Sequence, residues 1–441
     1  MTEPRRELSA FDIGCVVIGG IIGVGIFFTP QRVAEAVDTP QQVLLVWGLG
    51  GLLAVLGAMV FAELSLCVPG HGGLFCYLER AFGRTVAFLY GWSNWFVIQA
   101  GALGVVGLLL ARYLEVLWGP GQPWSDTGKV LVAAASIALF TCVNVLGLRL
   151  GKNVQNALTV LKVAALMFLV ALAWLRPAET ATEPLPAASG RSLPGMLGAA
   201  MLPVLFAMGG WQQGTFVAGA ARHRLSVPIG ILAGVAVVVV TYMTVNLAYL
   251  DLLGFQKART TEAIGAAAAE VALGSGGARV LAAVVVVSAA GILNTICMSP
   301  PYVLYAMAQQ GCFPAAFGRL HPRFHTPVLG VLGQGLWGVL LLLTVHFGSR
   351  WWNDGAAIDT LGFVCDGVVF ADWMFFMLCG AALLRLRRTA AVRSSFGGVV
   401  AAAFTLGALA VMVGAFASQP RASLTGLLLV LLGLAARRWL R

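Results

Sequence analysis

The sequence predicts an all-α membrane protein, and three features of its 441 residues point to this class. Hydrophobic residues make up 59% of the chain and charged residues only 10%, whereas a soluble domain carries about 25% charged residues. Apolar runs long enough to cross a hydrocarbon core of about 30 Å as helices recur along the whole chain. These runs are too long for the strands of a membrane barrel. We therefore expect one helical bundle in a lipid bilayer.

The apolar runs predict twelve membrane-spanning helices, with boundaries good to a few residues. They would form two five-helix inverted repeats, residues 12–175 and 194–384, followed by two helices within 385–441. Residues 1–11 would be a polar N-terminal segment, and residues 176–193, rich in Pro, Ala and Thr, an external loop. The expected spans are 12–37, 42–67, 86–117, 127–147, 153–175, 194–220, 227–251, 279–309, 327–347, 357–384, 395–416 and 421–438.

Lys and Arg residues predict the orientation of the bundle. Of the 28 such residues, 17 fall on the side that carries both termini and 10 on the other, while Lys162 alone lies within a span. Cytoplasmic connections are the ones rich in Lys and Arg. Both termini are therefore expected in the cytoplasm, with the protein in the cell inner membrane. The net charge of +10 then reflects topology, and we expect no nucleic-acid partner.

Other classes of function lack their expected residues. The eight Cys residues lie in or beside apolar runs, form no CxxC pair and are interpreted as small buried hydrophobes. The five His residues show no HExxH spacing, so neither a metal site nor a cofactor is expected. No clustered catalytic set points to a membrane-embedded enzyme. A channel would need a continuous polar stripe or a filter motif, and only two short polar interruptions occur.

These interruptions fall in the first helix of each repeat. The first helix contains Gly14, Gly19, Gly20, Gly23 and Gly25. Close helix packing is an adequate explanation for the first three, but less so for the cluster Gly23-Val24-Gly25. The sixth helix contains Pro203 and Gly209-Gly210, followed by Trp211-Gln212-Gln213. Interrupted helices at corresponding places in two halves are typical of inverted-repeat transporters.

An unwound segment at mid-membrane frees backbone groups, which are tolerated only where they line a cavity. The N-terminus of a half-helix presents N–H groups to an anion, and a C-terminus presents carbonyls to a cation. The α-carboxylate and α-ammonium of an amino acid need both together. The sequence thus favours a carrier of a small zwitterion, with the lipid bilayer as its surroundings.

Five stretches in order resemble the L-type amino acid transporter family of the amino acid–polyamine–organocation superfamily, particularly its bacterial members. The stretches are IGGIIGVGIFFTP, RLGKNVQNALTVLKVAAL, LPVLFAMGGWQQGTFVAG, SAAGILNTICMSPPYVLYAMAQQGCFP and LHPRFHTPVLGVLGQG. The resemblance covers most of the first ten helices. It implies alternating access around a midplane site formed by helices one and six, and a sodium-independent transporter of neutral amino acids that works by exchange or facilitated transport.

The resemblance also implies roles for individual residues. Ile22, Gly23, Val24 and Gly25 match the segment whose backbone receives the substrate carboxylate. Phe206 matches the aromatic residue that closes over the substrate. The carbonyls that receive the substrate amine are expected in the unwound part of helix six, which comprises Met208, Gly209, Gly210 and Trp211.

Lys162 lies in an apolar run about nine residues from the end of helix five, roughly 14 Å at the usual helical rise, which is far for snorkelling. In the family, a lysine here looks like a built-in replacement for sodium between helices one and eight. Ser288 is its expected partner, although its hydroxyl could equally bond its own helix. A buried amine can also exchange a proton, so a proton-coupled amino acid or amine symporter remains the alternative.

Other positions leave alternatives open. Gln212 is expected to line the cavity, and Asn294 either lines it or bonds a neighbouring helix. Val24 stands where the family often has Ser, and Met208 where it usually has a polar or aromatic residue. The matched pocket contains no acidic residue, which argues against cationic substrates. The connection between helices three and four has no Cys, so no disulfide-linked heavy subunit is expected.

Overall fold

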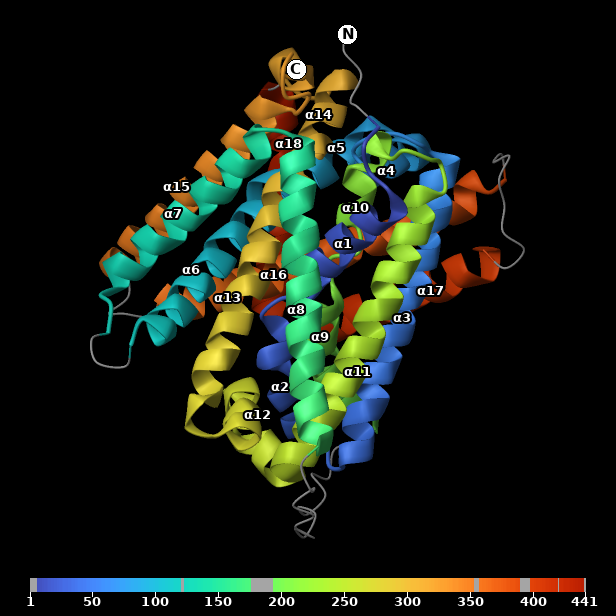
Figure 1. Ribbon diagram of the computed structural model, residues 1–441. Helices are drawn as coiled ribbons and strands as arrows, with labels where there is room; N and C mark the ends of the chain where they lie inside the picture. Colours follow the sequence, from blue (N-terminus) through green and yellow to red (C-terminus); the bar gives the residue numbers. More distant parts are fainter. Residues whose placement is uncertain are drawn as a thin grey trace.

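The computed structural model describes residues 6–119, 123–175, 193–352, 357–388, 397–418 and 420–439. Most of the predicted external loop, residues 176–192, lies outside this part. The described chain is a bundle of helices with both chain ends at the same end of the molecule (Figure 1). In chain order its helices are α1 (Ala10–Ile21), η1 (Gly25–Phe27), α2 (Thr29–Ala36), α3 (Pro40–Cys67), α4 (Leu74–Phe82), α5 (Arg84–Ser93), η2 (Asn94–Gln99), α6 (Ala100–Trp118), α7 (Asp126–Val145), α8 (Leu148–Leu175), α9 (Leu193–Met208), α10 (Gln213–Phe216), η3 (Ala218–Ala220), α11 (Ser226–Thr260), α12 (Ile264–Leu273), η4 (Gly274–Gly276), α13 (Gly277–Met298), α14 (Pro301–Gln309), η5 (Ala315–Gly318), α15 (Val328–Trp352), α16 (Ala357–Leu386), α17 (Gly397–Ser418) and α18 (Pro420–Trp439).

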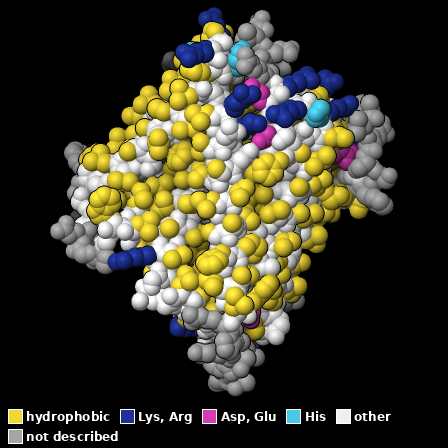
Figure 2. All heavy atoms as spheres, viewed as in Figure 1, with side chains coloured by type: hydrophobic (Ala, Val, Ile, Leu, Met, Phe, Trp, Pro, Cys, Tyr) yellow, Lys and Arg dark blue, Asp and Glu magenta, His cyan; other side chains and the backbone are white. Residues whose placement is uncertain are grey.

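Within the described residues, eight helices are long and apolar enough to cross a membrane. The other four predicted spans coincide with helices that are interrupted or fall outside that criterion: α1 with α2, α9 with α10, α16, and α18. Hydrophobic side chains cover the flank of the bundle, whereas Lys and Arg gather mainly at the end that carries the N-terminus (Figure 2). The all-helical membrane class is therefore as predicted, and the count of twelve and the repeat symmetry stay predictions.

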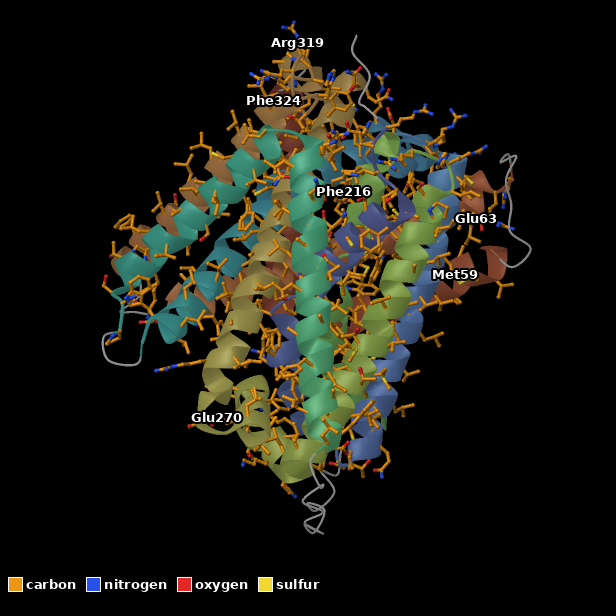
Figure 3. The ribbon with its side chains drawn as sticks, viewed as in Figure 1. Met59, Glu63, Phe216, Glu270, Arg319 and Phe324 are labelled. Carbon is orange, nitrogen blue, oxygen red and sulfur yellow. The ribbon has the colours of Figure 1, made fainter. Side chains whose placement is uncertain are left out.

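Several long helices are divided by their local sequence. The third predicted span begins with α5, passes through the π-helical turn η2 and continues as α6. The eighth is divided between α13 and α14 at Pro300-Pro301, because proline cannot donate the backbone hydrogen bond that would continue the helix. Glu63 on α3 pairs with Arg387 beyond α16, which ties these helices together near the basic end (Figure 3).

Small residues allow α1 and α11 to cross in backbone contact. A Cβ atom at Gly234 would lie 3.1 Å from the carbonyl oxygen of Gly14, and one at Gly230 would lie 2.7 Å from that of Ala10. Side chains at these positions would force the two helices apart. Gly14 thus lies in a close helix contact, as predicted. The contact brings α11 directly against α1, the first part of the interrupted helix.

Candidate substrate site

Helix one is interrupted where Gly23 and Gly25 were singled out. α1 ends at Ile21, Ile22 is extended with ψ 98°, and regular helix resumes at Thr29 after η1. Among the described residues, the N–H groups of Val24, Gly25 and Ile26 donate to no backbone carbonyl. These donors lie at the start of a helical segment, where an anion is favoured.

Helix six is interrupted at its predicted glycine pair. α9 ends at Met208, and the chain turns at Gly210, whose φ of +127° is accessible mainly to glycine. A Cβ atom at Gly210 would also lie 2.5 Å from the carbonyl oxygen of Gly20. The N–H of Gln213 then donates to the carbonyl of Gly210 and restarts the helix. Both conformation and space therefore require glycine here.

The two interruptions face each other. A Cβ atom at Gly25 would lie 3.2 Å from Ala207 and 3.9 Å from the ring of Phe206. The Phe206 side chain is 41% exposed, and its ring centroid is 6.2 Å from that of Phe28 on the helix-one side. A Cβ atom at Gly23 would collide with Ile292 of α13. The segment predicted to bind a carboxylate therefore lies beside apolar groups from helices six and eight.

Tyr242 of α11 joins the two interruptions, and the sequence had not distinguished it. Its buried hydroxyl is 3.0 Å from the carbonyl oxygen of Ile21 and 3.3 Å from that of Ala207, two acceptors for its proton. The ring packs edge-on against Trp47. In sequence it is one aromatic residue in an apolar run, and its only signal was that a buried tyrosine hydroxyl usually finds a partner.

Lys162 is fully buried between helix one and helix eight. Its Nζ atom donates to the carbonyl oxygens of Ile22 at 2.9 Å, Ser288 at 3.3 Å and Gly19 at 3.4 Å. The hydroxyl of Ser288 donates to the carbonyl of Ile22 at 3.1 Å, and not to its own helix. The ammonium thus occupies a nest of carbonyl oxygens at the end of α1, where helix one unwinds.

Three other residues were predicted to belong to the site, and the structure gives each of them different surroundings. The Trp211 ring is buried against Trp373 and Phe376, so only its backbone belongs to the interruption. Asn294 donates to the carbonyl of Gly151 and to Gln155, and accepts from Asn144. These bonds connect α13 to the fourth and fifth spans. Gln212 is 4% exposed, and its Oε1 atom has no hydrogen-bond partner among the described residues.

The first described residues close the end of the site nearest the N-terminus. We call residues 7–12 the N-terminal clasp. Glu7 and Leu8 bond the backbone of Ala220, at the end of helix six. The carboxylate of Asp12 accepts from Lys152 at 3.0 Å and from Asn156 at 2.7 Å, both on α8. The clasp therefore holds helices one, five and six together at the end of the bundle that carries the N-terminus.

The site offers hydrogen-bond donors and acceptors from the backbone. In the part of the chain that the structure describes, no three His, Cys, Asp or Glu residues group so as to hold a metal ion. Free N–H groups at the helix-one interruption match an anion, and the C-terminal end of α9 at Met208 matches a cation. Together they can hold a zwitterion without forming or breaking a covalent bond.

The chain is similar to known amino acid transporters over most of its length. The serine/threonine exchanger SteT of Bacillus subtilis (strain 168) is 30% identical over 346 residues, which cover 77% of this chain and 77% of that protein. The b(0,+)-type amino acid transporter 1 of Oryctolagus cuniculus is 26% identical over 398 residues, covering 88% and 77%. The Asc-type amino acid transporter 1 of Homo sapiens is 25% identical over 437 residues, covering 97% and 81%.

A model of the amino acid permease family matches residues 8–434, which is nearly the whole chain. The relatives are transporters and not enzymes, and they include the exchangers and L-type carriers that the sequence resembles. With its two interrupted helices and a match of this length, the chain belongs to the amino acid permease family.

Proposed function

We propose that the chain is a sodium-independent secondary transporter of neutral amino acids, which works by alternating access as an exchanger or facilitator. The free N–H groups of Val24, Gly25 and Ile26 support a site for the substrate carboxylate. The carbonyls at the end of α9, with Gly209 and Gly210, would receive the ammonium. Phe206, Ala207 and Ile292 would contact the side chain. Their apolar character favours neutral substrates over charged ones.

The observation that carries sodium independence is the position of Lys162. Its ammonium is within 3.4 Å of three carbonyl oxygens from helices one and eight. Carbonyl oxygens are also the ligands that sodium takes at unwound helices in transporters. A resident ammonium among them makes a sodium ion both unnecessary and electrostatically unfavourable. Ser288 would orient the shared carbonyl of Ile22.

The distribution of charge supports an orientation with both termini in the cytoplasm of the cell inner membrane. Lys and Arg gather at the end that carries both termini (Figure 2), as expected for a cytoplasmic surface. The connection between α6 and α7 contains no Cys, so we expect transport without a disulfide-linked subunit. The purified chain alone should then be active in proteoliposomes.

Uptake of radiolabelled alanine and leucine into proteoliposomes, with unlabelled amino acids in competition, tests the proposal. Uptake should saturate and stay unchanged when choline replaces sodium. Gly25→Trp should abolish it, because the indole would fill the space against Ala207, while folded protein remains. Gly48→Trp is the matched control, since a Cβ atom at Gly48 meets nothing within 4 Å. A strict sodium requirement would contradict the role of Lys162.

The alternative, proton-coupled symport, is favoured by one feature of the same lysine. Its three hydrogen-bond acceptors are neutral carbonyls, so no carboxylate bonded to it holds its proton in place. Uptake driven by an inward pH gradient, and lost in Lys162→Ala while counterflow persists, would identify this mode. Uptake that is indifferent to the pH gradient would leave exchange or facilitation.

A further inference from the structure

A hollow of about 150 Å³ lies at the basic end of the bundle. It is lined by the turn between α7 and α8, by the loop before α15 and by the N-terminal clasp. Phe324 and the nearby Arg319 are at this end in Figure 3. The lining residues are Glu7, Leu146, Gly147, Leu148, Arg149, Arg323, Phe324 and His325.

One wall of the hollow is the N-terminus of a long helix. α8 runs for 28 residues from Leu148, and the first N–H groups of a helix have no partner within it. Gly147, with a φ of +134°, turns the chain into this helix. The free N–H groups and the helix dipole favour an anion beside Leu148 and Arg149.

The side chains around the hollow also favour an anion. Arg149 and Arg323 are exposed, and among the described residues neither forms an ion pair. The Nδ1 atom of His325 is buried without a hydrogen-bond partner. His325 also has a φ of +55°, uncommon for a residue with a side chain. Two exposed arginines and a helix N-terminus therefore line one space.

The walls are held in place by hydrogen bonds. The Nδ1 atom of His321 accepts from the N–H groups of Arg323 and Phe324. The hydroxyl of Thr326 donates to the carbonyl of Val145 at 3.2 Å, which joins the loop before α15 to the end of α7. The hollow is thus formed before any ligand enters, which lowers the entropic cost of binding.

Glu7 connects the hollow to α8 and to the segment that follows helix six. Its backbone carbonyl accepts from Lys152 of α8 and from Arg222 beyond helix six. Glu7 lines the hollow, and its carboxylate forms no ion pair within the described residues. A second anion placed there would meet its carboxylate and would disturb the clasp.

We propose that this hollow binds a phosphate group, held by Arg149, Arg323 and the N-terminus of α8, and that its occupancy loosens the N-terminal clasp. In the orientation proposed above, it opens toward the head groups of the inner leaflet. The phosphate would belong to an anionic phospholipid or be free in the cytoplasm. Arginine binds phosphate oxygens through paired charge-assisted hydrogen bonds, which suits either source.

The test is binding by the purified full chain in neutral detergent. The probes are short-chain phosphatidic acid, phosphatidylcholine of the same chain length, and inorganic phosphate, with dissociation constants from tryptophan fluorescence. Phosphatidic acid or inorganic phosphate should bind and phosphatidylcholine should not. Binding of inorganic phosphate points to the free anion, and binding of phosphatidic acid alone points to a lipid. No binding of either would overturn the proposal.

Variants separate a built site from diffuse positive charge. Arg149→Gln and Arg323→Gln should each weaken binding about tenfold, the effect of one charge-assisted contact. Arg319→Gln, an exposed arginine of the same loop outside the hollow, should leave it unchanged. Glu7→Gln should tighten binding severalfold, a gain that misfolding cannot produce. An equal loss in Arg319→Gln, or no gain in Glu7→Gln, would contradict the assigned position.

Discussion

The backbone at the two interrupted helices is bonded by different kinds of group. At helix one, the buried ammonium of Lys162 on α8 donates to the carbonyl of Ile22. An ion pair between Asp12 and Lys152 fixes the start of α1. At helix six, the stabilising groups are neutral. The hydroxyl of Tyr242 donates to the carbonyl of Ala207, and the ring of Trp211 packs among aromatic residues. Among the described residues, the protein therefore supplies its own cation at helix one but none at helix six, where the proposed function places the substrate ammonium.

Removing the charge at helix one should have the largest effect. Lys162→Ala removes the ammonium from three buried carbonyls, of which that of Ile22 keeps the hydroxyl of Ser288, and we expect uptake to fall at least about a hundredfold, equivalent to about 3 kcal/mol of lost interaction. Lys257→Ala, an exposed lysine on α11, is the control. If sodium restores uptake in Lys162→Ala, the ammonium and the ion occupy equivalent places. Uptake like that of the wild type would show that helix one needs no cation.

The interruption of helix six can be strained directly. Gly210→Ala puts a Cβ atom at a positive φ and against the carbonyl of Gly20, which costs about 1–3 kcal/mol. We expect uptake about tenfold or more below that of the wild type, measured in proteoliposomes at equal protein. Gly198→Ala in α9 has open space around it and should be neutral. Equal behaviour of the two variants would mean that the turn at Gly210 is unimportant.

The link between the two interruptions should matter less. Tyr242→Phe removes a hydroxyl that bonds both Ile21 and Ala207, a loss of about 1 kcal/mol that should raise KM about fivefold with little change in kcat. Tyr249→Phe, on the same helix, removes a buried hydroxyl that has no partner among the described residues, and it should not raise KM. Identical KM values for the two variants would exclude Tyr242 from positioning.

The packing at the end of helix six, near Gly219, should lose stability at low pH. The start of helix one is held instead by the ion pair between Asp12 and Lys152. His71, in the connection between α3 and α4, stacks on Tyr302 and lies against Gly219. Burial lowers the pKa of His71 from 6.5 to about 4. The unfolded chain thus binds the proton more readily, and the stability due to neutral His71 is present above pH 6.5 and lost as the pH falls toward 4.

This contribution is at most about 3 kcal/mol, and it should appear as a fall in Tm between pH 6.5 and 4. His71→Asn should flatten that part of the profile relative to the wild type. His223→Gln changes an exposed histidine in the loop before α11 and should follow the wild-type curve. A wild-type Tm that does not change over this range would contradict the burial of a neutral imidazole.

The sequence was most informative where glycine or charge interrupts an apolar run. Gly23, Gly25 and the pair Gly209-Gly210 predicted both interruptions, because glycine is costly in helices and must have a local reason. Lys162 stood out since a lysine within a span needs partners, and the structure provides them. The family followed from the stretches around the same residues, and the comparisons confirmed it.

Contacts between distant apolar helices could not be predicted in the same way. Tyr242 resembles any other aromatic residue in a span, and only the approach of Ile21 and Ala207 gives its hydroxyl a role. Trp211 was expected at the interruption, but its ring needs burial and turns to Trp373 and Phe376. The clasp depends on Asp12 and Lys152, which are 140 residues apart in sequence.

The glycine crossing between α1 and α11 has a mechanical consequence. Gly230 and Gly234 lie against the backbone of α1 and against the short branched side chains of Ile13 and Val17, so the crossing contains no long, flexible side chain that could absorb a change in the separation of the two helices. Two helices packed this closely can slide past each other, but they cannot move apart by small amounts without losing their contacts. The first half of helix one is therefore coupled to α11 as one lever, and any swing that parts Asp12 from Lys152 must carry Tyr242 with it.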